Sequence, residues 1–569
     1  SSKLRFERML DVEESRRLIM LRSRYALADA ACPVPSLEAR APLYVKFDRP
    51  LTRTLAQAMQ ERGVSPIGYL WPNTSVVRAR DAQALESLRK WLLSTPEVLG
   101  TLVSLPEDVC SRGVLESAGT RDLQLLFWRD TDSAEAEALL AGAGAALLEA
   151  TLEQGRLSLD TPLVSVRVSD AGLQVLARSP WLERIELMPR KVADNQTSVS
   201  ISNAQPAVMG VAPYNLDGTN QIVGVWDNGP ARDTHEQFQN APVPSLIGAG
   251  SKRVLRVDTQ SFQDHGTHVT GTIVGDGTGN ATAKGYAPKA YALAHFWSNV
   301  DQKRRNAKHN WNHVADNHSY SAFGGGSDDW GEYTADCQVN DWTNRDFLMN
   351  MVQSAGNYAS SNPGGAGPKP YTGGTQTVGS FNAHRNGFII GAVQDNLDIT
   401  SFSSRGPCDD GRLVPQFCAN GEGLTSCINT GGNQAYASYS GTSMSGPSVC
   451  GGLTLLSQLW RRENSQRILE PDTARALLAL TCADRGNSGP DYIYGFGIVD
   501  VKAAADVILA DVASGRKQIV RGALRQGEVV EYSLTIAAGT PSLRVACSWL
   551  DIYASTTAQV AVVNDLDLE

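Results

Sequence analysis

The sequence lacks the features that mark several classes of protein. No apolar run approaches the roughly 20 residues that a membrane-spanning helix needs. Basic residues are fewer than acidic ones, which gives a net charge of −9. A nucleic-acid-binding protein usually carries a basic face, so this balance argues against that class. We therefore expect neither a membrane nor a nucleic-acid partner.

Cysteine is also scarce, and its count is odd. Nine cysteines in 569 residues leave at least one without a partner in the chain. No two of them have the CxxC spacing typical of a structural zinc site. Cys408, Cys418 and Cys427 crowd one glycine-rich stretch. Two alternatives remain open for them: a disulfide between two of the three, or free buried thiols.

The length predicts two to four domains, and the first of these regions contains an internal repeat. After an N-terminal extension over residues 1–41, a pattern of strand, helix, two strands, helix and strand occurs over 42–115 and again over 116–190. In the second copy the predicted first helix covers 134–152. This βαββαβ pattern indicates two α+β units of ferredoxin-like type, with one irregular α+β domain as the alternative.

Three further regions follow the repeat. Residues 191–215 are polar and weakly periodic, which is typical of a linker. Residues 216–510 alternate buried strands with helices and predict a parallel α/β sheet covered on both faces. Residues 511–569 predict strands at the start of a C-terminal β-sandwich. Because half a sandwich would expose strand edges, we expect a further segment, either a separate C-terminal chain or one absent from this sequence, to complete it.

The α/β region offers one candidate for each role in nucleophilic catalysis. A serine hydroxyl needs an imidazole to remove its proton and a carboxylate to orient that imidazole. Asp227 ends the apolar strand IVGVWD, and His265 lies in HGTHVTG. Ser443 lies in SGTSMSGP, where Pro447 suits the first turn of a helix. Asn357, in SAGN, can donate a hydrogen bond to the oxyanion of a tetrahedral intermediate.

These motifs resemble those of the subtilisins. The order Asp, His, Ser is the subtilisin order, and HGTHVTG, SAGN and GTSMSGP resemble the family's histidine, oxyanion and serine motifs. SFSSRGPCDDGRLVP resembles the segment that precedes the serine in many members. The final residues resemble the β-sandwich of a branch of alkaline proteases, so the resemblance covers about 198–569. The aspartate motif departs from the family because Asn228 stands where serine or threonine is usual.

The resemblance implies an α/β fold of subtilisin type and a serine endopeptidase that needs no cofactor for its chemistry. It makes His268 structural. It also implies that peptide substrates bind along two segments, which consist of Ser319, Tyr320 and Ser321 and of Ser354, Ala355 and Gly356. Ser321 stands where glycine is common in the family. A secreted or extracytoplasmic location is implied as well. The alternatives are an inactive pseudo-peptidase and a non-catalytic binding protein of the same fold.

The sequence also contains residues of the types that bind metal ions. His309, His313 and His318 are close together in the sequence, and we interpret them as a solvated helix face rather than as metal ligands. The resemblance makes a structural calcium conceivable in GDGTGNATAKG or NDLDL. The alternative for both segments is an Asx-rich turn.

The N-terminal units resemble the inhibitory prodomains of subtilisins, in which the last strand leads into the active-site cleft. The second unit directly precedes the linker, which makes it the better candidate for the inhibitor. The protein's own N-terminal prodomain is thus an expected partner of the peptidase domain. We therefore expect a zymogen that cuts itself between about Arg190 and Asn203.

Overall fold

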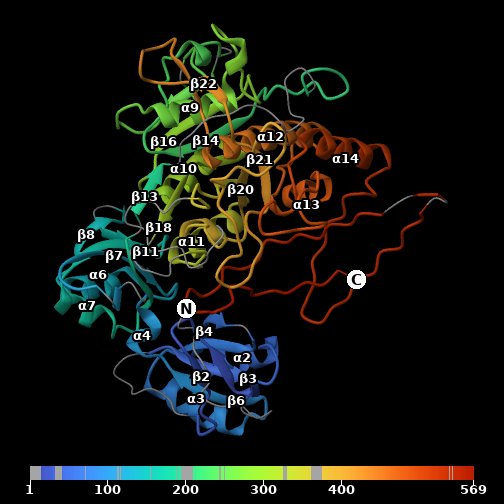
Figure 1. Ribbon diagram of the computed structural model, residues 1–569. Helices are drawn as coiled ribbons and strands as arrows, with labels where there is room; N and C mark the ends of the chain where they lie inside the picture. Colours follow the sequence, from blue (N-terminus) through green and yellow to red (C-terminus); the bar gives the residue numbers. More distant parts are fainter. Residues whose placement is uncertain are drawn as a thin grey trace.

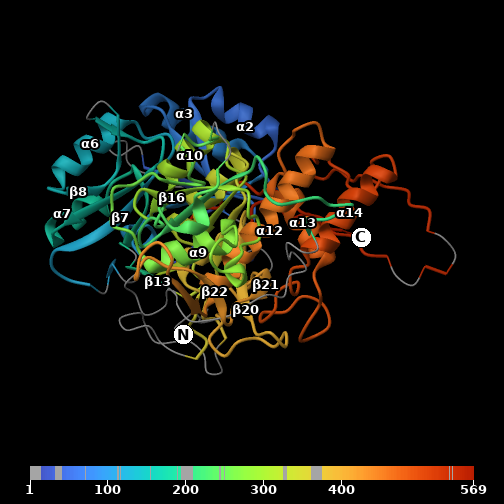
Figure 2. The ribbon, with the colours of Figure 1, turned by 90° about the horizontal axis from the view of Figure 1, so that it is seen from above.

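The structure is a computed structural model of the 569-residue chain. It describes residues 15–568 apart from 33–40, 71, 112–113, 116, 154–155, 189, 194–208, 242–244, 249, 324–329, 361–374, 537–538 and 541–542. Figure 1 shows two N-terminal units below a larger domain, and the C-terminal segment returning to the junction between them. Seen from above, the second unit and helices α13 and α14 lie at opposite ends of the molecule (Figure 2).

The first unit follows a short antiparallel hairpin of β1 (Leu18–Met20) and β2 (Tyr25–Leu27). Its four strands form one antiparallel sheet in the order β4-β5-β3-β6. Thr52 and Asp81 cap its two helices through their side chains. The elements are β3 (Leu43–Phe47), α2 (Arg53–Gln60), β4 (Val64–Leu70), β5 (Thr74–Ala79), α3 (Ala82–Ser94) and β6 (Val98–Val103), followed by the short helix α4 (Pro106–Val109).

The second unit repeats this topology, with strand order β12-β7-β11-β8. Both units therefore have the expected ferredoxin-like order, in which the first and third strands lie at the centre of the sheet. The elements are β7 (Arg121–Phe127), α6 (Ser133–Gly142), β8 (Ala146–Glu149), the hairpin of β9 (Thr151–Glu153) and β10 (Arg156–Ser158), β11 (Leu163–Val168), α7 (Asp170–Leu176) and β12 (Leu182–Leu187).

The predicted helix over 134–152 is wrong in its second half. Helix α6 ends at Gly142, and Gly144 takes a left-handed φ of 60°. Residues of the predicted second half form the edge strand β8, which pairs with β11. Leucine and alanine favour a helix by themselves, but the glycines interrupt it and the open edge of β11 provides hydrogen bonds for a strand.

The larger domain contains the expected parallel sheet, with seven strands in the order β15-β16-β14-β17-β19-β20-β21. The fold is the α/β type that the sequence predicted. Its strands are β14 (Ile222–Asp227), β15 (Val254–Arg256), β16 (Tyr291–Phe296), β17 (Ala315–His318), β19 (Met351–Ser354), β20 (Phe388–Val393) and β21 (Phe417–Asn420). Two hairpin strands, β22 (Leu424–Cys427) and β23 (Tyr436–Tyr439), pair beside it.

Helices cover both faces of this sheet, so its central strand is buried along its whole length. Val223 and Val225 of β14 pack on the side of α9 and α12, whereas Ile222 and Trp226 pack on the side of α10. The helices are α9 (Asp264–Val274), α10 (Val300–Trp311), α11 (Ala335–Asp346), α12 (Thr442–Glu463), α13 (Pro471–Thr481) and α14 (Val501–Ala513), with short 3₁₀ turns at η2 (Glu236–Phe238), η3 (Ala281–Ala283) and η4 (Ser380–Ala383).

Two features beside the sheet differ from the predictions. Residues 190–193 of the predicted linker form a strand, β13 (Arg190–Ala193), which pairs with β18 (Tyr320–Phe323). In the described part of 511–568, no strand forms after α14, so the predicted start of a β-sandwich is not observed there. Val530, Tyr532 and Leu534 alternate as in a strand, but all three are exposed. A strand also needs a hydrogen-bonded neighbour, which alternation alone does not supply. Completion of the sandwich by a further segment stays a prediction.

Candidate functional site

The predicted site residues converge at the carboxyl edge of the seven-stranded sheet. Asp227 ends β14, Asn357 lies three residues after the end of β19, and Ser319 follows β17. His265 and Ser443 are each the second residue of a helix, α9 and α12. Because parallel strands all end at one edge, residues far apart in sequence come together there.

Asp227 and His265 form a buried carboxylate–imidazole pair. The distance from Nδ1 of His265 to Oδ1 of Asp227 is 2.6 Å. The backbone N–H of Asn228 donates to the same carboxylate oxygen at 2.8 Å, so the unusual Asn228 supports Asp227 through its main chain. A carboxylate on Nδ1 fixes the tautomer in which Nε2 is the basic nitrogen.

Ser443 lies in the first turn of α12 and exchanges hydrogen bonds with Ser319. The Ser443 hydroxyl donates to the Ser319 carbonyl at 3.1 Å, and the Ser319 hydroxyl donates to the Ser443 carbonyl at 3.0 Å. Pro447 lies in the second turn of the helix and not, as predicted, in the first. Because proline has no N–H, the Ser443 carbonyl has no helical donor four residues later, and Ser319 fills that place.

The side-chain amide of Asn357 is oriented by Thr442. The Thr442 backbone N–H and hydroxyl lie 2.9 and 3.1 Å from Oδ1 of Asn357, and the Thr442 hydroxyl accepts from the N–H of Gly356 at 3.0 Å. That hydroxyl has a single proton, and the backbone N–H can only donate. The oxygen of the Asn357 amide therefore faces Thr442, and its NH₂ group is directed to the other side. The sequence motif contains Thr442, but sequence reasoning gave it no role.

In the two segments predicted to bind substrate, the side chains of Tyr320 and Ser321 are bonded within the protein. Tyr320 is fully buried, and its hydroxyl bonds to Nδ1 of His318 at 2.9 Å. The hydroxyl of Ser321 accepts from the side-chain amide of Asn382 at 3.2 Å. The same amide also donates to the Ser354 carbonyl. Asn382 thus ties the two segments together, a role that no sequence motif indicated.

The backbone of the second segment is fixed by the sheet and by glycine. The N–H of Ala355 donates to Ile390 of the neighbouring strand β20 at 2.8 Å. Gly356 has a φ of 104°, a conformation that side chains rarely adopt. Its carbonyl accepts from the N–H of Ser404 at 2.8 Å. The segment that leads to Asn357 is therefore held on both sides.

His268 is a structural residue in this geometry. It is fully buried, stacks on the Tyr439 ring at 4.6 Å and donates through Nε2 to the Leu424 carbonyl at 2.8 Å. Burial, together with the neighbouring His265, lowers the pKa of His268 to about 3. It is therefore neutral at physiological pH.

The interpretation of His309, His313 and His318 as a solvated helix face is wrong for two of the three. His309 is exposed, but His313 and His318 are buried under α10. Trp226 stacks between His318 and His295, with ring centroids 5.2 and 4.5 Å away. The fold buries these histidines because the aromatic Trp226 offers a flat apolar face directly below the site.

The described residues form no metal site and no disulfide. Within the residues described, no three His, Cys, Asp or Glu side chains are grouped to hold a metal ion. Asp276 instead accepts from Thr278 N–H at 2.8 Å, and Asn280 from Thr282 N–H at 3.1 Å, as Asx turns do. Cys408, Cys418 and Cys427 are buried free thiols in three separate apolar clusters.

Comparison with known proteins agrees with this arrangement. Residues 218–497 match the Subtilase family, which is also called peptidase S8. These residues form a subtilase domain. The match includes the sheet, both helices of the site and the serine motif, so the resemblance seen in the motifs extends over the whole domain.

Three curated relatives share this domain. Bacillopeptidase F of Bacillus subtilis is 29% identical over 278 residues, which is 45% of this chain and 18% of that protein. Fervidolysin of Fervidobacterium pennivorans is 27% identical over 50% of this chain and 41% of its own length. An alkaline protease of Shouchella clausii is 27% identical over 60% of this chain and 79% of its own length. The chain thus spans less than half of the first two relatives.

A solved structure resembles a large part of this fold. The crystal structure of fervidolysin, described as a keratinolytic enzyme related to subtilisin, has a TM-score of 0.50. Its sequence identity is 18%, and the match covers 70% of this chain and 62% of that one. This likeness concerns the fold alone.

Among the residues described, no helix is long and apolar enough to cross a membrane.

Proposed function

We propose that the protein is a serine endopeptidase in which Ser443 is the nucleophile and His265 the general base. The observation that carries this proposal is the 2.6 Å contact of His265 Nδ1 with Asp227, at the sheet edge where Ser443 begins a helix. In this proposal Asp227 orients the imidazole and stabilises its protonated form. Membership of the subtilase family supports the same roles.

The proposed reaction follows from these positions. The Ser443 oxygen attacks the carbonyl carbon of a peptide bond while Nε2 of His265 takes the hydroxyl proton. The imidazolium then gives this proton to the leaving amine, and an acyl-enzyme remains. A water molecule, deprotonated by the same imidazole, hydrolyses the acyl-enzyme. The NH₂ group of Asn357, directed away from Thr442, stabilises the oxyanion in both steps.

Substrate binding frees the nucleophile in this mechanism. The Ser443 hydroxyl has one proton, and it donates that proton to the Ser319 carbonyl at 3.1 Å. A peptide that extends the pairing along β18 would offer a backbone N–H to that carbonyl. The hydroxyl would then be released toward His265. We propose protein and peptide chains in extended form as the substrates, with no cofactor needed for the chemistry.

We further propose that the protein is made as an autoinhibited precursor. Strand β13 pairs antiparallel with β18 in the register Val192 to Ser321 and Ala193 to Tyr320, which is the edge that a substrate would use. Ser443 and His265 are 0% and 2% exposed in this state. The predicted domain boundaries suit this proposal, with 116–190 as inhibitor and 216–510 as peptidase. Most of the predicted processing region, 194–203, lies outside the described residues.

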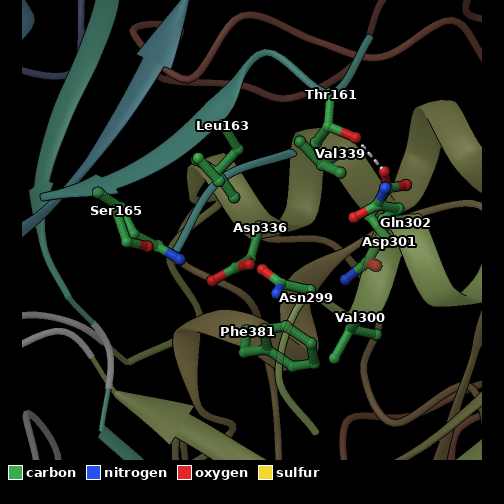
Figure 3. A pocket seen from close by; sticks show the side chains of 13 residues that line it. Thr161, Leu163, Ser165, Asn299, Val300, Asp301, Gln302, Asp336, Val339 and Phe381 are labelled. Carbon is green, nitrogen blue, oxygen red and sulfur yellow. Dashed lines mark hydrogen bonds between the residues drawn. The ribbon is translucent and has the colours of Figure 1, made fainter. Parts of the chain in front are cut away.

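The second unit contacts helices α10 and α11 of the peptidase domain, which supports an inhibitory role. The carboxylate of Glu186 accepts from the first N–H of α11, on Ala335, at 3.1 Å. Thr161 donates to Asp301 of α10 (Figure 3). A small cavity of about 70 Å³ lies between these elements, with Leu163 on one side and Val339 on the other.

A secreted or extracytoplasmic location stays a prediction.

Covalent labelling tests the proposed function directly. A fluorophosphonate probe reacts with an activated serine, so wild type, freed of the N-terminal region that precedes the cut, should be labelled on Ser443. Ser443→Ala should not be labelled under the same conditions. If neither protein took up the probe, the rival function, a non-catalytic binding protein of this fold, would be favoured.

A further inference from the structure

The C-terminal segment 548–558 is a coil whose residues 554–558 are buried, which is unusual. Loops normally lie on the surface, where water satisfies their backbone groups. Here Ala554, Thr556 and Thr557 are each at most 1% exposed. Figure 1 shows the segment returning from the far end of the chain to the junction of the N-terminal units with the peptidase domain. We call residues 548–558 the C-terminal clasp.

One end of the clasp is anchored to the peptidase domain. The backbone of Asp551 makes two hydrogen bonds with the Asn386 side chain, at 3.0 and 2.7 Å. The Asp551 carboxylate pairs with Arg385. Arg475 of α13 donates to the Trp549 carbonyl. Polar groups of the coil are therefore satisfied by side chains of the catalytic domain rather than by water.

The middle of the clasp contacts the second unit through Glu183. This β12 carboxylate is buried and accepts three hydrogen bonds on the same oxygen. Two come from the clasp, from the Ser555 hydroxyl at 2.7 Å and the Thr556 N–H at 3.1 Å. The third comes from Gln338 of α11 at 2.9 Å. A buried carboxylate needs such partners, and removing the clasp would deprive Glu183 of two of them.

Arg129 of the second unit also contacts both α11 and the clasp. Its guanidinium lies 4.2 Å from the ring centre of Trp342 on α11 and 4.3 Å from that of Tyr553 in the clasp. The cation is thus held between an aromatic ring of the helix and an aromatic ring of the clasp. Cation–π contacts gain strength when they are shielded from water.

The far end of the clasp contacts the N-terminal hairpin. Leu21 and Ala558 form an antiparallel bridge, and the Arg22 N–H donates to the Thr557 carbonyl at 2.7 Å. The clasp therefore bonds to the hairpin, to the second unit and to the peptidase domain within eight residues, from Asp551 to Ala558.

We propose that the C-terminal clasp fastens the second unit onto helix α11 and so slows the release of the N-terminal region after the chain is cut. The inference rests on the proposed function only for the cut itself. Two anchoring groups of the second unit are shared, because Glu183 and Arg129 both lie between α11 and the clasp. A cut between 194 and 203 breaks none of these contacts, so they remain to hold the N-terminal fragment.

The test separates docking from catalysis. In the Ser443→Ala full chain, the recognition sequence of a site-specific protease replaces part of 194–203, and that protease makes the cut. We expect the two fragments to co-elute in size-exclusion chromatography. In the Tyr553→Ala and Glu183→Ala variants, dissociation of the N-terminal fragment, followed by surface plasmon resonance, should be about tenfold faster. Tyr532→Ala, an exposed tyrosine outside the clasp, is the matched control and should behave as the parent.

Two results would overturn the proposal. One is separation of the parent fragments on the column. The other is a dissociation rate of Tyr553→Ala and Glu183→Ala equal to that of Tyr532→Ala. Circular dichroism of the uncut proteins establishes that each variant is folded. Failure of the wild type to cut itself would contradict the proposed autoprocessing but leave this result unchanged, because the added protease makes the cut.

Discussion

Ser319 and Ser443 exchange two hydrogen bonds, each hydroxyl donating to the other residue's carbonyl, at 3.1 and 3.0 Å. These two bonds connect two parts of the site. One is the segment with which a substrate would pair, and the other is the first turn of the helix that carries the proposed nucleophile. The exchange exists because Pro447 leaves the Ser443 carbonyl without its helical donor.

This relationship predicts a compensating pair of substitutions. Ser319→Ala leaves the buried Ser443 carbonyl without a donor and should lower the free energy of unfolding by about 1–3 kcal/mol. Adding Pro447→Ala supplies a backbone N–H four residues after Ser443, and part of the loss should return. Urea unfolding in the Ser443→Ala background, which prevents self-digestion, measures the double-mutant cycle. Additive effects of the two substitutions would contradict the coupling.

Asn357→Ala should lower kcat by about 10²–10³, or about 3–4 kcal/mol, with little change in KM. The magnitude is that of a subtilisin which loses its oxyanion-hole asparagine. Thr442→Val should lower kcat less, because the Thr442 N–H still orients the amide. Steady-state kinetics on a peptide substrate measures both. A kcat of Asn357→Ala equal to that of wild type would remove this residue from the oxyanion hole.

Ser443→Ala should abolish turnover and leave the fold intact, because the change removes one small side-chain hydroxyl. Peptide hydrolysis in a clean preparation and the unfolding midpoint are the two measurements. Substantial residual hydrolysis would mean that another residue is the nucleophile.

Self-cleavage should occur after Ala193 and before Asn203. The chain runs along β13 toward Ser443, since Val192 pairs with Ser321 and Ala193 with Tyr320, while Ser443 contacts the next residue, Ser319. Sequencing the new N-terminus of wild type tests this, with Ser443→Ala as control. Equal cutting of the inactive variant, or a terminus within the second unit, would contradict self-processing.

The free energy of unfolding should fall steeply in mild acid because three histidines are buried in the folded protein. Burial lowers the pKa of His268, His313 and His384 to about 3 each, from an ordinary value of 6.5. A depressed folded-state pKa means that the unfolded chain binds more protons below pH 6.5, so stability is present above that pH and lost as the pH falls toward 3. Three such groups predict a slope of about 4 kcal/mol per pH unit below pH 6.

Urea unfolding of Ser443→Ala between pH 7 and pH 5 measures this slope. His268→Asn should reduce it by about a third, whereas His309→Asn, at an exposed position, should leave it unchanged. A flat profile would show that these histidines titrate normally in the folded protein.

The sequence by itself determined the local structure and the chemistry-bearing residues. IVGVWD had to be a buried strand, because an uninterrupted apolar run of this length suits a sheet covered on both faces. Asp227 at its end, His265 and Ser443 at two helix starts, and Asn357 after a third apolar run lay at element ends that a parallel sheet collects at one edge. The two βαββαβ patterns predicted two sheets of one topology, because each pattern is complete within about 70 residues.

The tertiary structure decided what depends on contacts between distant segments. Helix α6 ends early because β11 offers its edge to residues 146–149. His313 and His318 are buried because α10 and Trp226 cover them. The roles of Thr442 and Asn382 exist only when β19, η4 and α12 are brought together. The C-terminal clasp, a coil without periodicity, is fixed by Glu183, Arg129 and Asn386, which are 165 or more residues away in sequence. Local periodicity carries no information about such partners, because side-chain contacts at that separation form only after the chain has folded.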